Sequence, residues 1–219
     1  MSRVFADRRQ AGRLLAAALA HLKDAAPVVL ALPRGGVPVA AEVAQALGAP
    51  LDLVLVRKIG VPGAEELAMG AVVDGADPVV VRNADIIAAA QVTPQAFEAV
   101  CARELREIER RRALYVGSRR RAPIAGRTVV VVDDGIATGA TARAALEALR
   151  ARGPARLILA TPVAPPETVS LLQGFADAVV CLKTPEPFGA IGYFYDDFRQ
   201  VDDAEVIDLL ARHPVPPEA

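Results

Sequence analysis

Short, unbroken apolar runs alternate along the chain with longer stretches of helical periodicity. Five runs rich in valine, isoleucine and leucine lack the apolar–polar alternation of a half-exposed strand: Val28–Leu32, Leu51–Val56, Val129–Val132, Arg156–Ala160 and Ala178–Leu182. Such runs are typical of strands that are buried on both faces of a parallel sheet. The stretches between them predict helices at Arg8–Asp24, Val37–Leu47, Pro94–Val116, Thr141–Arg152 and Pro166–Phe175. We therefore expect an α/β fold with a doubly wound, mostly parallel sheet of five strands.

Two segments depart from this alternation. Ala71–Asp74 and Val79–Arg82, joined by Gly75-Ala76-Asp77-Pro78, predict an inserted β-hairpin. Beyond Leu182, prolines and glycine surround a cluster of aromatic residues, which predicts an irregular hood, and a last helix capped by Asp202 or Asp203 follows it. We expect one domain, with the α/β core at residues 1–183 and the hood and C-terminal helix at residues 184–219.

Composition narrows the class of protein. The chain has 219 residues, of which 53% are apolar and 23% are charged, so it can bury a full core. Its net charge of -1 provides no basic field that would draw it to nucleic acid or anionic lipid. Two distant cysteines suggest no disulfide framework, and two histidines near the termini argue against a Ser-His-Asp triad. The absence of a membrane-length apolar run and the polar N-terminal segment predict a cytoplasmic protein.

The stretch VVVVDDGIATGAT, residues 129–141, carries the strongest chemical signal. The buried strand is followed at once by Asp133 and Asp134, and then by a turn that leads into a helix. Glycines let backbone N–H groups converge, threonines add hydroxyl donors, and a helix N-terminus adds partial positive charge, so the turn suits a phosphate. The two carboxylates would repel that phosphate but suit neutral hydroxyls, such as a ribose diol. The alternative is a plain strand–turn–helix corner in which Asp134 only caps the helix.

This stretch resembles the binding motif for 5-phosphoribosyl-1-pyrophosphate (PRPP) in the type I phosphoribosyltransferases. The resemblance implies the fold of that family and a transfer of 5-phosphoribose to a nitrogen acceptor with release of pyrophosphate. It implies that Asp133 and Asp134 bind the ribose hydroxyls, and that Mg²⁺ is held mainly by PRPP close to them. It also implies that the 5′-phosphate is wrapped by Gly135, Ile136, Ala137, Thr138, Gly139, Ala140 and Thr141.

Two earlier loops agree with this resemblance. Arg34, Gly35 and Gly36 follow the first predicted strand and open a helix, which suits an anion, although a plain turn has a similar pattern. In the family this loop binds pyrophosphate and often contains a cis non-proline peptide. Arg57 and Lys58 end the second predicted strand ahead of Gly60 and Gly63, as in adenine phosphoribosyltransferases. The resemblance implies a catalytic lid loop whose two cations face the pyrophosphate; a solvated strand end is the alternative.

The C-terminal stretch TPEPFGAIGYFYDDF is similar to a segment of the hypoxanthine-guanine enzymes in which a phenylalanine stacks on the base. The similarity indicates Phe188 as the stacking residue and Lys183 as a contact to the acceptor; packing at the sheet edge is the alternative for these aromatics. Ala137 departs from that subfamily, which has an aspartate there, so the identity of the planar acceptor stays open.

The segment Arg103–Arg121 interleaves arginine with glutamate, which favours a solvated helix face over an RNA contact or a subunit interface. We therefore expect PRPP and a small acceptor as partners rather than nucleic acid. The main alternative function is a non-catalytic PRPP-sensing regulator that contacts nucleic acid through Arg119–Arg121. Another transfer or a hydrolysis on the same fold is a third, and a homodimer is one alternative for the oligomeric state.

Overall fold

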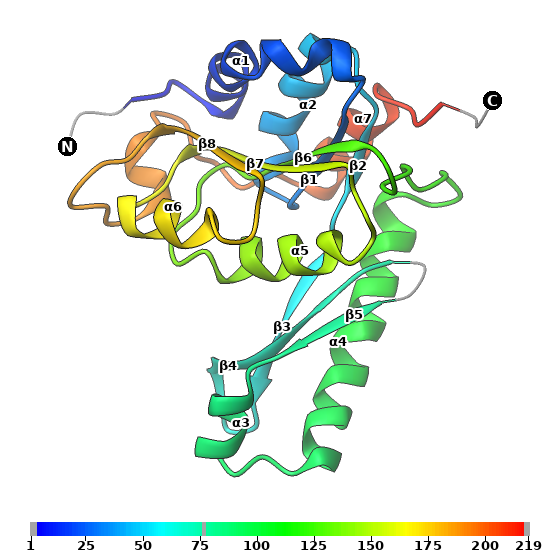
Figure 1. Cartoon of the computed structure of the whole chain (residues 1–219), viewed down its shortest axis with the longest axis vertical. Coiled ribbons are helices and arrows are strands. Elements are labelled where there is room, and N and C mark those ends of the chain that lie inside the picture. Colours follow the sequence, from blue (N-terminus) through cyan, green and yellow to red (C-terminus); the bar gives the residue numbers. More distant parts are fainter. Residues whose placement is uncertain (1–3, 76–77, 217–219) are drawn as a thin grey trace.

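A five-stranded parallel sheet lies at the centre of the computed structural model, which describes residues 4–75 and 78–216 (Figure 1). Its strand order is β2-β1-β6-β7-β8, and every neighbouring pair is parallel. The strands span Leu51–Leu53 (β2), Val28–Ala31 (β1), Thr128–Val132 (β6), Arg156–Val163 (β7) and Ala178–Lys183 (β8). The predicted five-strand parallel sheet is thus confirmed.

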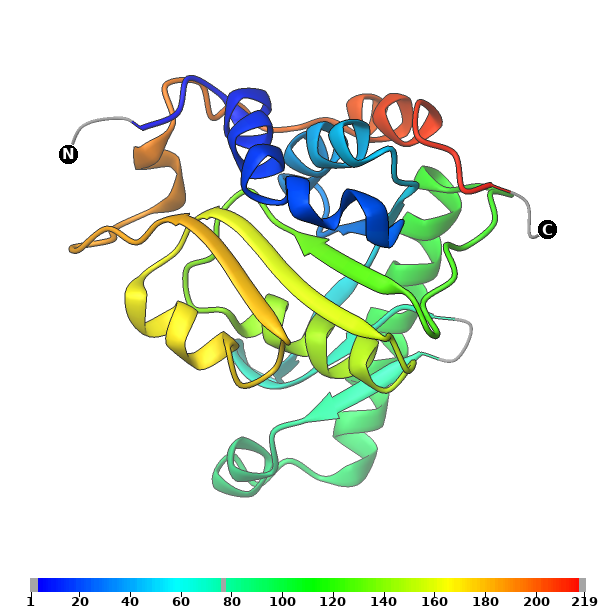
Figure 2. The same ribbon diagram turned by 45° about the horizontal axis from the view of Figure 1, so that its top comes forward.

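Helices cover both faces of this sheet, as Figures 1 and 2 show. One face carries α1 (Arg8–Ala18), the 3-10 turn η1 (Ala20–Ala25), α2 (Gly36–Leu47) and α7 (Asp203–Ala211), and the other carries α5 (Ala140–Arg150) and α6 (Pro166–Leu172). Val129–Val132 of β6 are completely buried as a result. Each such valine contributes roughly 1.5–3 kcal/mol by leaving water. This two-sided burial explains why the strands lack polar alternation, and it confirms the doubly wound α/β class.

Residues 56–115, which lie between β2 and β6 in the sequence, form a second unit that extends from the core (Figure 1). We name this unit the arm. Its antiparallel sheet has the order β3-β4-β5, formed by Val56–Val61 (β3), Ala64–Val73 (β4) and Val79–Arg82 (β5). The short helix α3 (Ala84–Ala89) and the long helix α4 (Pro94–Tyr115) complete it. The predicted hairpin is confirmed, because Val73 pairs with Val79 and Ala71 with Val81. Ala76 and Asp77 of its connection lie outside the described residues.

The sequence interpretation of residues 51–63 is wrong in one respect. We expected a single strand over Leu51–Val56 followed by a lid loop that starts at Arg57. Instead β2 ends at Leu53, and Arg57 and Lys58 lie within β3. The reason is pairing: Arg57 is opposite Val72 and Lys58 is opposite Ala71 of β4, so the segment completes a sheet that the sequence pattern showed only in part.

The hood, residues 184–202, follows β8 and contains the 3-10 turn η2 (Ile191–Phe194). It packs on the N-terminal segment, where Phe5 forms a parallel bridge with Tyr195. The side chain of Asp202 accepts a hydrogen bond from the Glu205 backbone N–H, so the predicted cap of the last helix is confirmed. Among the described residues, no helix combines the length and the apolar character needed to span a bilayer.

Candidate functional site

The loops after β1 and β6 meet at one edge of the parallel sheet, and two glycines make their approach close. A methyl group on Gly35 would lie 2.2 Å from Asp134 Oδ2, and one on Gly36 would lie 2.7 Å from the Val132 carbonyl oxygen. Both distances are far inside van der Waals contact, so no other residue type fits without movement. A cis peptide joins Pro33 to Arg34 in the same loop, as the family resemblance implied. The predicted pyrophosphate loop and the carboxylate pair are therefore adjacent.

Asp134 is 7% exposed and is held from two sides. Its Oδ2 accepts a hydrogen bond from Arg8 Nε at 2.7 Å, and its backbone carbonyl accepts one from the Tyr195 hydroxyl at 2.5 Å. Burial raises the pKa of Asp134, while the Arg8 guanidinium acts in the opposite direction. Burial also raises the pKa of Tyr195, so its hydroxyl keeps the proton that it donates. Asp134 is thus a buried carboxylate with a cationic partner.

Asp133 is half-buried, and among the described residues it has no such cationic partner at bonding distance. Its Oδ1 accepts a hydrogen bond from the Asp134 backbone N–H at 2.9 Å. Burial, followed by the negative charge of Asp134, raises the pKa of Asp133 well above its usual value. Adjacent carboxylates with raised pKa values are common at functional sites, because they are costly for the fold alone.

The turn after these carboxylates has the features of a phosphate site. Gly139, with φ of +78°, is the residue before α5, and it offers the helix no side-chain cap. The first N–H groups of a helix need acceptors, so an uncapped N-terminus leaves them available to an anion. Thr138 and Thr141 are exposed beside it. The Thr168 hydroxyl donates to the Ala137 carbonyl oxygen at 2.7 Å and fixes the turn from α6.

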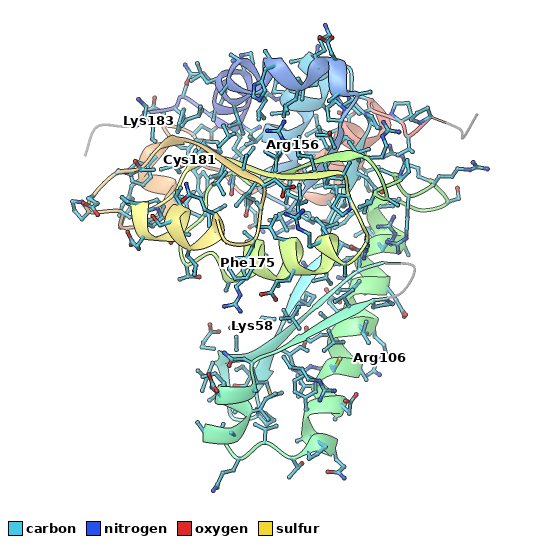
Figure 3. All side chains as sticks on the ribbon, viewed as in Figure 1. Lys58, Arg106, Arg156, Phe175, Cys181 and Lys183 are labelled. Carbon is cyan, nitrogen blue, oxygen red and sulfur yellow. The ribbon has the colours of Figure 1, made fainter. Side chains whose placement is uncertain are left out.

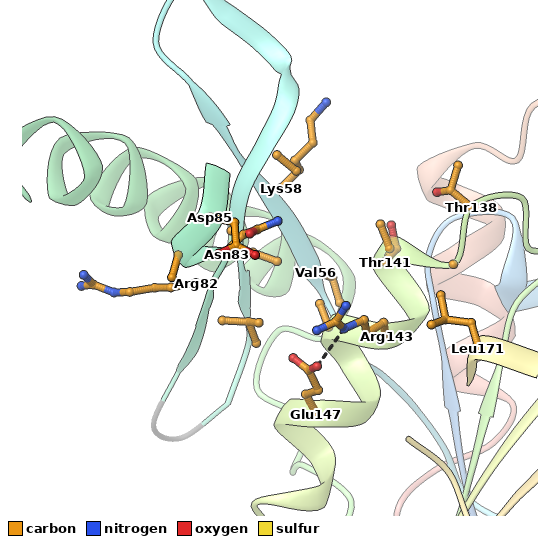
Figure 4. A pocket seen from close by; sticks show the side chains of 18 residues that line it. Val56, Lys58, Arg82, Asn83, Asp85, Thr138, Thr141, Arg143, Glu147 and Leu171 are labelled. Carbon is orange, nitrogen blue, oxygen red and sulfur yellow. Dashed lines mark hydrogen bonds and ion pairs between the residues drawn. The ribbon is translucent and has the colours of Figure 1, made fainter. Parts of the chain in front are cut away.

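A cleft of about 580 Å³ separates this turn from the arm (Figure 4). Thr138, Thr141 and Arg143 line the core side, and Lys58 and Asn83 line the arm side. Lys58 Nζ forms an ion pair with Glu66 Oε2 at 3.0 Å, and that carboxylate is fully exposed. The volume suits a small ligand. The structure therefore brings Lys58 and the predicted phosphate turn to facing walls of one cleft.

Two predicted cations have protein partners instead. Arg57 lies on the other face of β3 from Lys58, as alternation along a strand requires. Its guanidinium contacts Glu104 of α4, with Nη2 at 2.8 Å from Oε2. Arg34 Nη1 lies 3.4 Å from Asp203 Oδ1, whose carboxylate also accepts the Tyr115 hydroxyl at 2.7 Å. A contact of either arginine with pyrophosphate stays a prediction and would require release from these partners.

Lys183 and Phe188, the predicted acceptor residues, lie apart from the cleft between the arm and the start of α5. Figure 3 shows Lys183 at the end of β8, well separated from Lys58. Phe188 packs against Phe194 with ring centroids 5.2 Å apart. Neither Lys183 nor Phe188 is among the described residues that line the cleft. The hood does reach the phosphate turn, because a methyl group on Gly135 would lie 2.4 Å from the Ile191 side chain. The role of Phe188 and Lys183 stays a prediction.

Sequence reasoning missed Arg8 and Tyr195. Arg8 precedes Asp134 by 126 positions and Tyr195 follows it by 61, so no local motif links them. The only sequence signal is an arginine at the start of a predicted helix and a tyrosine inside the aromatic cluster, and neither pattern indicates a contact with Asp134.

The residues present fit a magnesium ion that is carried by its substrate. Asp133 and Asp134 supply hard oxygen donors, which Mg²⁺ prefers. In the part of the chain that the structure describes, no group of three or more acidic, cysteine or histidine residues could hold a metal ion. Mg²⁺ typically keeps substrate phosphates and waters among its ligands, so one or two carboxylates suffice.

Comparison with known proteins places this arrangement in a family. A family model described as the phosphoribosyl transferase domain matches residues 6–197. Two Mycobacterium tuberculosis proteins, each provisionally named a phosphoribosyl transferase, are 49% identical over 210 residues, 96% of this chain and 47% of theirs. The chain thus spans about half the length of these curated relatives. The crystal structure of TT1426 from Thermus thermophilus is 46% identical, with a TM-score of 0.84 over 96% of this chain and 99% of that one. The chain belongs to the phosphoribosyltransferase family of the type I fold.

Proposed function

We propose that this protein transfers 5-phosphoribose from PRPP to a nitrogen atom of a planar acceptor and releases pyrophosphate, with Mg²⁺ as cofactor. The observation that carries the proposal is the meeting of the loops after β1 and β6 at one sheet edge. The carboxylates Asp133 and Asp134 lie against Gly35 and Gly36, and the uncapped start of α5 follows directly.

The ribose is bound by the carboxylate pair. Ionised carboxylates accept hydrogen bonds from neutral hydroxyls, and each such bond contributes roughly 1.5–3 kcal/mol. The 5′-phosphate binds the backbone N–H groups at the start of α5, together with the hydroxyls of Thr138 and Thr141. The pyrophosphate lies by the Gly35–Gly36 backbone at the start of α2, where the helix N-terminus adds partial positive charge.

Transfer requires stabilisation of the leaving pyrophosphate while positive charge develops on the ribose ring. Asp133 and Asp134 would hold Mg²⁺ together with substrate oxygens, and the ion would neutralise part of the pyrophosphate charge. Lys58 faces Thr138 and Thr141 across the cleft, and its exposed partner Glu66 is readily exchanged for a substrate phosphate, since surface ion pairs are weak. Lys58 therefore supplies a further cation for the departing group.

The acceptor binds on the hood side, where Phe188 offers a ring face and Lys183 a polar contact. This assignment rests on the similarity of the C-terminal stretch and on the contact between Ile191 and Gly135, which joins the hood to the phosphate turn. A stacked ring discriminates little among planar acceptors, so polar contacts would set identity.

The contacts of the arginines in and after α4 favour an enzyme over a regulator that contacts nucleic acid. Arg119 donates to the His213 carbonyl oxygen at 2.9 Å, and Arg121 pairs with the buried carboxylate of Asp74 at 2.9 Å. Glu107 pairs with Arg110 and Arg111 along α4. These arginines therefore have internal or intrahelical partners, as expected for a solvated helix face and its connection to the core.

The test is a screen of nucleobases and related planar nitrogen heterocycles with PRPP and Mg²⁺, in which pyrophosphate release is measured. Acceptor-dependent release that is lost in Asp133→Asn is the expected result. Calorimetric titration of PRPP provides a second readout that needs no acceptor. If the wild-type protein neither binds PRPP nor releases pyrophosphate with any acceptor, the proposal is wrong.

A further inference from the structure

Arg8, the first residue of α1, connects the N-terminal segment to the carboxylate pair. Its side chain is 11% exposed and uses three different contacts. Nε donates to Asp134 Oδ2 at 2.7 Å, and Nη1 donates to the Arg199 carbonyl oxygen at 2.8 Å. The guanidinium also lies over the Phe198 ring, 3.9 Å from its centroid. An arginine with so many fixed contacts is an orienting group rather than a mobile surface charge.

Arg8 is held by two segments that pair with each other, the N-terminal segment and the hood. The backbone N–H groups of Val4 and Phe5 donate to the Phe194 carbonyl oxygen at 3.0 and 2.9 Å. In return, the Asp196 N–H donates to the Phe5 carbonyl oxygen at 2.9 Å. The ring of Phe5 packs against that of Tyr195, with centroids 5.3 Å apart. The N-terminal segment and the hood therefore form one unit, and this unit contacts Asp134 twice, through Arg8 and through Tyr195.

These contacts determine how the carboxylate of Asp134 lies. Arg8 takes Oδ2, Gly35 closes off the space beside that oxygen, and the Tyr195 hydroxyl fixes the Asp134 backbone. Oδ1 is outside the Arg8 ion pair. A carboxylate fixed at one oxygen and at its backbone has a defined plane, so its second oxygen presents a lone pair in a defined direction. A ribose hydroxyl needs such an acceptor.

We propose that Arg8 is the positioning residue for ribose recognition, because it fixes Asp134 so that the carboxylate can accept a hydrogen bond from a ribose hydroxyl of PRPP. The inference rests on the proposed function and extends it to a residue outside the sequence motif. The opposite reading is a latch in which Arg8 competes with ribose for Asp134. Arg8 has two further partners, Arg199 and Phe198, that hold it in place, and release would leave a buried guanidinium without its carboxylate.

The experiment compares three variants and three ligands by calorimetric titration in the presence of Mg²⁺. Arg8→Met keeps a long apolar side chain over Phe198 but removes the charge, and Arg8→Lys keeps the charge but removes the planar donor pair. Arg9→Met is the matched control, because Arg9 is an exposed neighbour whose nearest carboxylate oxygen, on Glu205, is 3.9 Å away. The ligands are PRPP, ribose 5-phosphate and inorganic pyrophosphate, and only the first two contain the ribose diol.

Arg8→Met is expected to weaken the binding of PRPP and of ribose 5-phosphate about tenfold or more, while the affinity for pyrophosphate stays within about twofold of wild type. Arg8→Lys should fall between Arg8→Met and wild type, and Arg9→Met should match wild type. In an Asp134→Asn background, Arg8→Met should cause little further loss, because both changes act on the same contact. Circular dichroism checks that each variant is folded, and if Arg8→Met does not fold, Arg8→Lys decides by the same ligand comparison.

Several outcomes would overturn the inference while leaving the proposed function intact. Unchanged or tighter PRPP binding in folded Arg8 variants would show that Arg8 is dispensable or is a latch. An equal loss for pyrophosphate and for the ribose ligands would show a general structural role. Failure of the wild-type protein to bind PRPP is a different result, because it contradicts the proposed function itself.

Discussion

Gly35→Ala is a sharp test of how closely the loops after β1 and β6 fit together. Gly35 has φ of -57° and ψ of -37°, values that alanine adopts freely. At such a position, replacement of glycine by alanine usually stabilises a protein by about 0.4–1 kcal/mol, because the unfolded chain loses freedom. Here the added methyl group would lie 2.2 Å from Asp134 Oδ2 and 2.6 Å from its Cγ. The carboxylate must therefore move, and the sign of the effect should reverse.

The magnitude follows from what that movement breaks. Asp134 Oδ2 accepts the Arg8 hydrogen bond, and a hydrogen bond to a charged group is worth roughly 1.5–3 kcal/mol. After the alanine benefit is subtracted, we expect Gly35→Ala to destabilise the protein by about 1–2 kcal/mol. For a chain of this size that lowers Tm by roughly 2–8 °C. PRPP affinity should fall at least tenfold, since about 1.4 kcal/mol corresponds to one order of magnitude.

The assay pairs thermal unfolding with calorimetric titration of PRPP, and Gly174→Ala is the matched control. A methyl group on Gly174 would meet only the Leu171 carbonyl oxygen, at 3.5 Å, which is ordinary contact. That variant should stay within about 0.5 kcal/mol of wild type and bind PRPP normally. If Gly35→Ala were as stable as wild type and bound PRPP equally well, Asp134 would not be confined by this loop, and the reasoning would fail.

Three further predictions combine these assays with steady-state measurement of pyrophosphate release. Asp133→Asn should abolish measurable PRPP binding yet stabilise the ligand-free protein by about 0.5–2 kcal/mol at neutral pH. Because folding raises the pKa of Asp133, its ionisation costs stability, so the difference between variant and wild type should vanish as the pH falls below about 4. A variant less stable than wild type at pH 7 would contradict this. Lys58→Ala should lower kcat more than PRPP affinity, since the lysine acts on the leaving pyrophosphate, and equal losses in both would count against that role. Phe188→Leu should raise the KM for the acceptor by an amount equivalent to roughly 1–3 kcal/mol with PRPP affinity nearly intact, and a loss of PRPP affinity instead would place Phe188 elsewhere in the mechanism.

The central sheet and the turn that joins β6 to α5 were predictable because their signals are local. A strand that is buried on both faces appears as an unbroken apolar run, as in Val129–Val132, whatever its partners are. The turn that follows uses residue types whose backbone and hydroxyl chemistry can be recognised without a structure. The arrangement of Asp133, Asp134 and the start of α5 was therefore accessible from thirteen consecutive letters of the sequence.

The remaining features depend on contacts between distant segments. Gly60 favours a loop, but pairing of β3 with β4 outweighs that local preference, and the turn begins only at Pro62. The direction of Arg57 was unpredictable for the same reason, because the register of β3 turns it toward Glu104 and away from Lys58. Arg8 illustrates the limit most clearly, since its partner Asp134 is 126 positions away and nothing in either neighbourhood indicates the other.

Because the N-terminal segment packs on the hood, the contacts that support Asp134 can form only late in the synthesis of the chain. Arg8 and Arg199 are 191 positions apart, so the support for Asp134 does not exist until nearly the whole described chain has been made. At about 5–20 residues per second, Arg8 would be without these partners for roughly 10–40 s after it is synthesised. A nascent chain therefore carries residues 129–141 well before it can hold Asp134 in place, and under the proposed function ribose recognition is expected to appear only as the hood emerges.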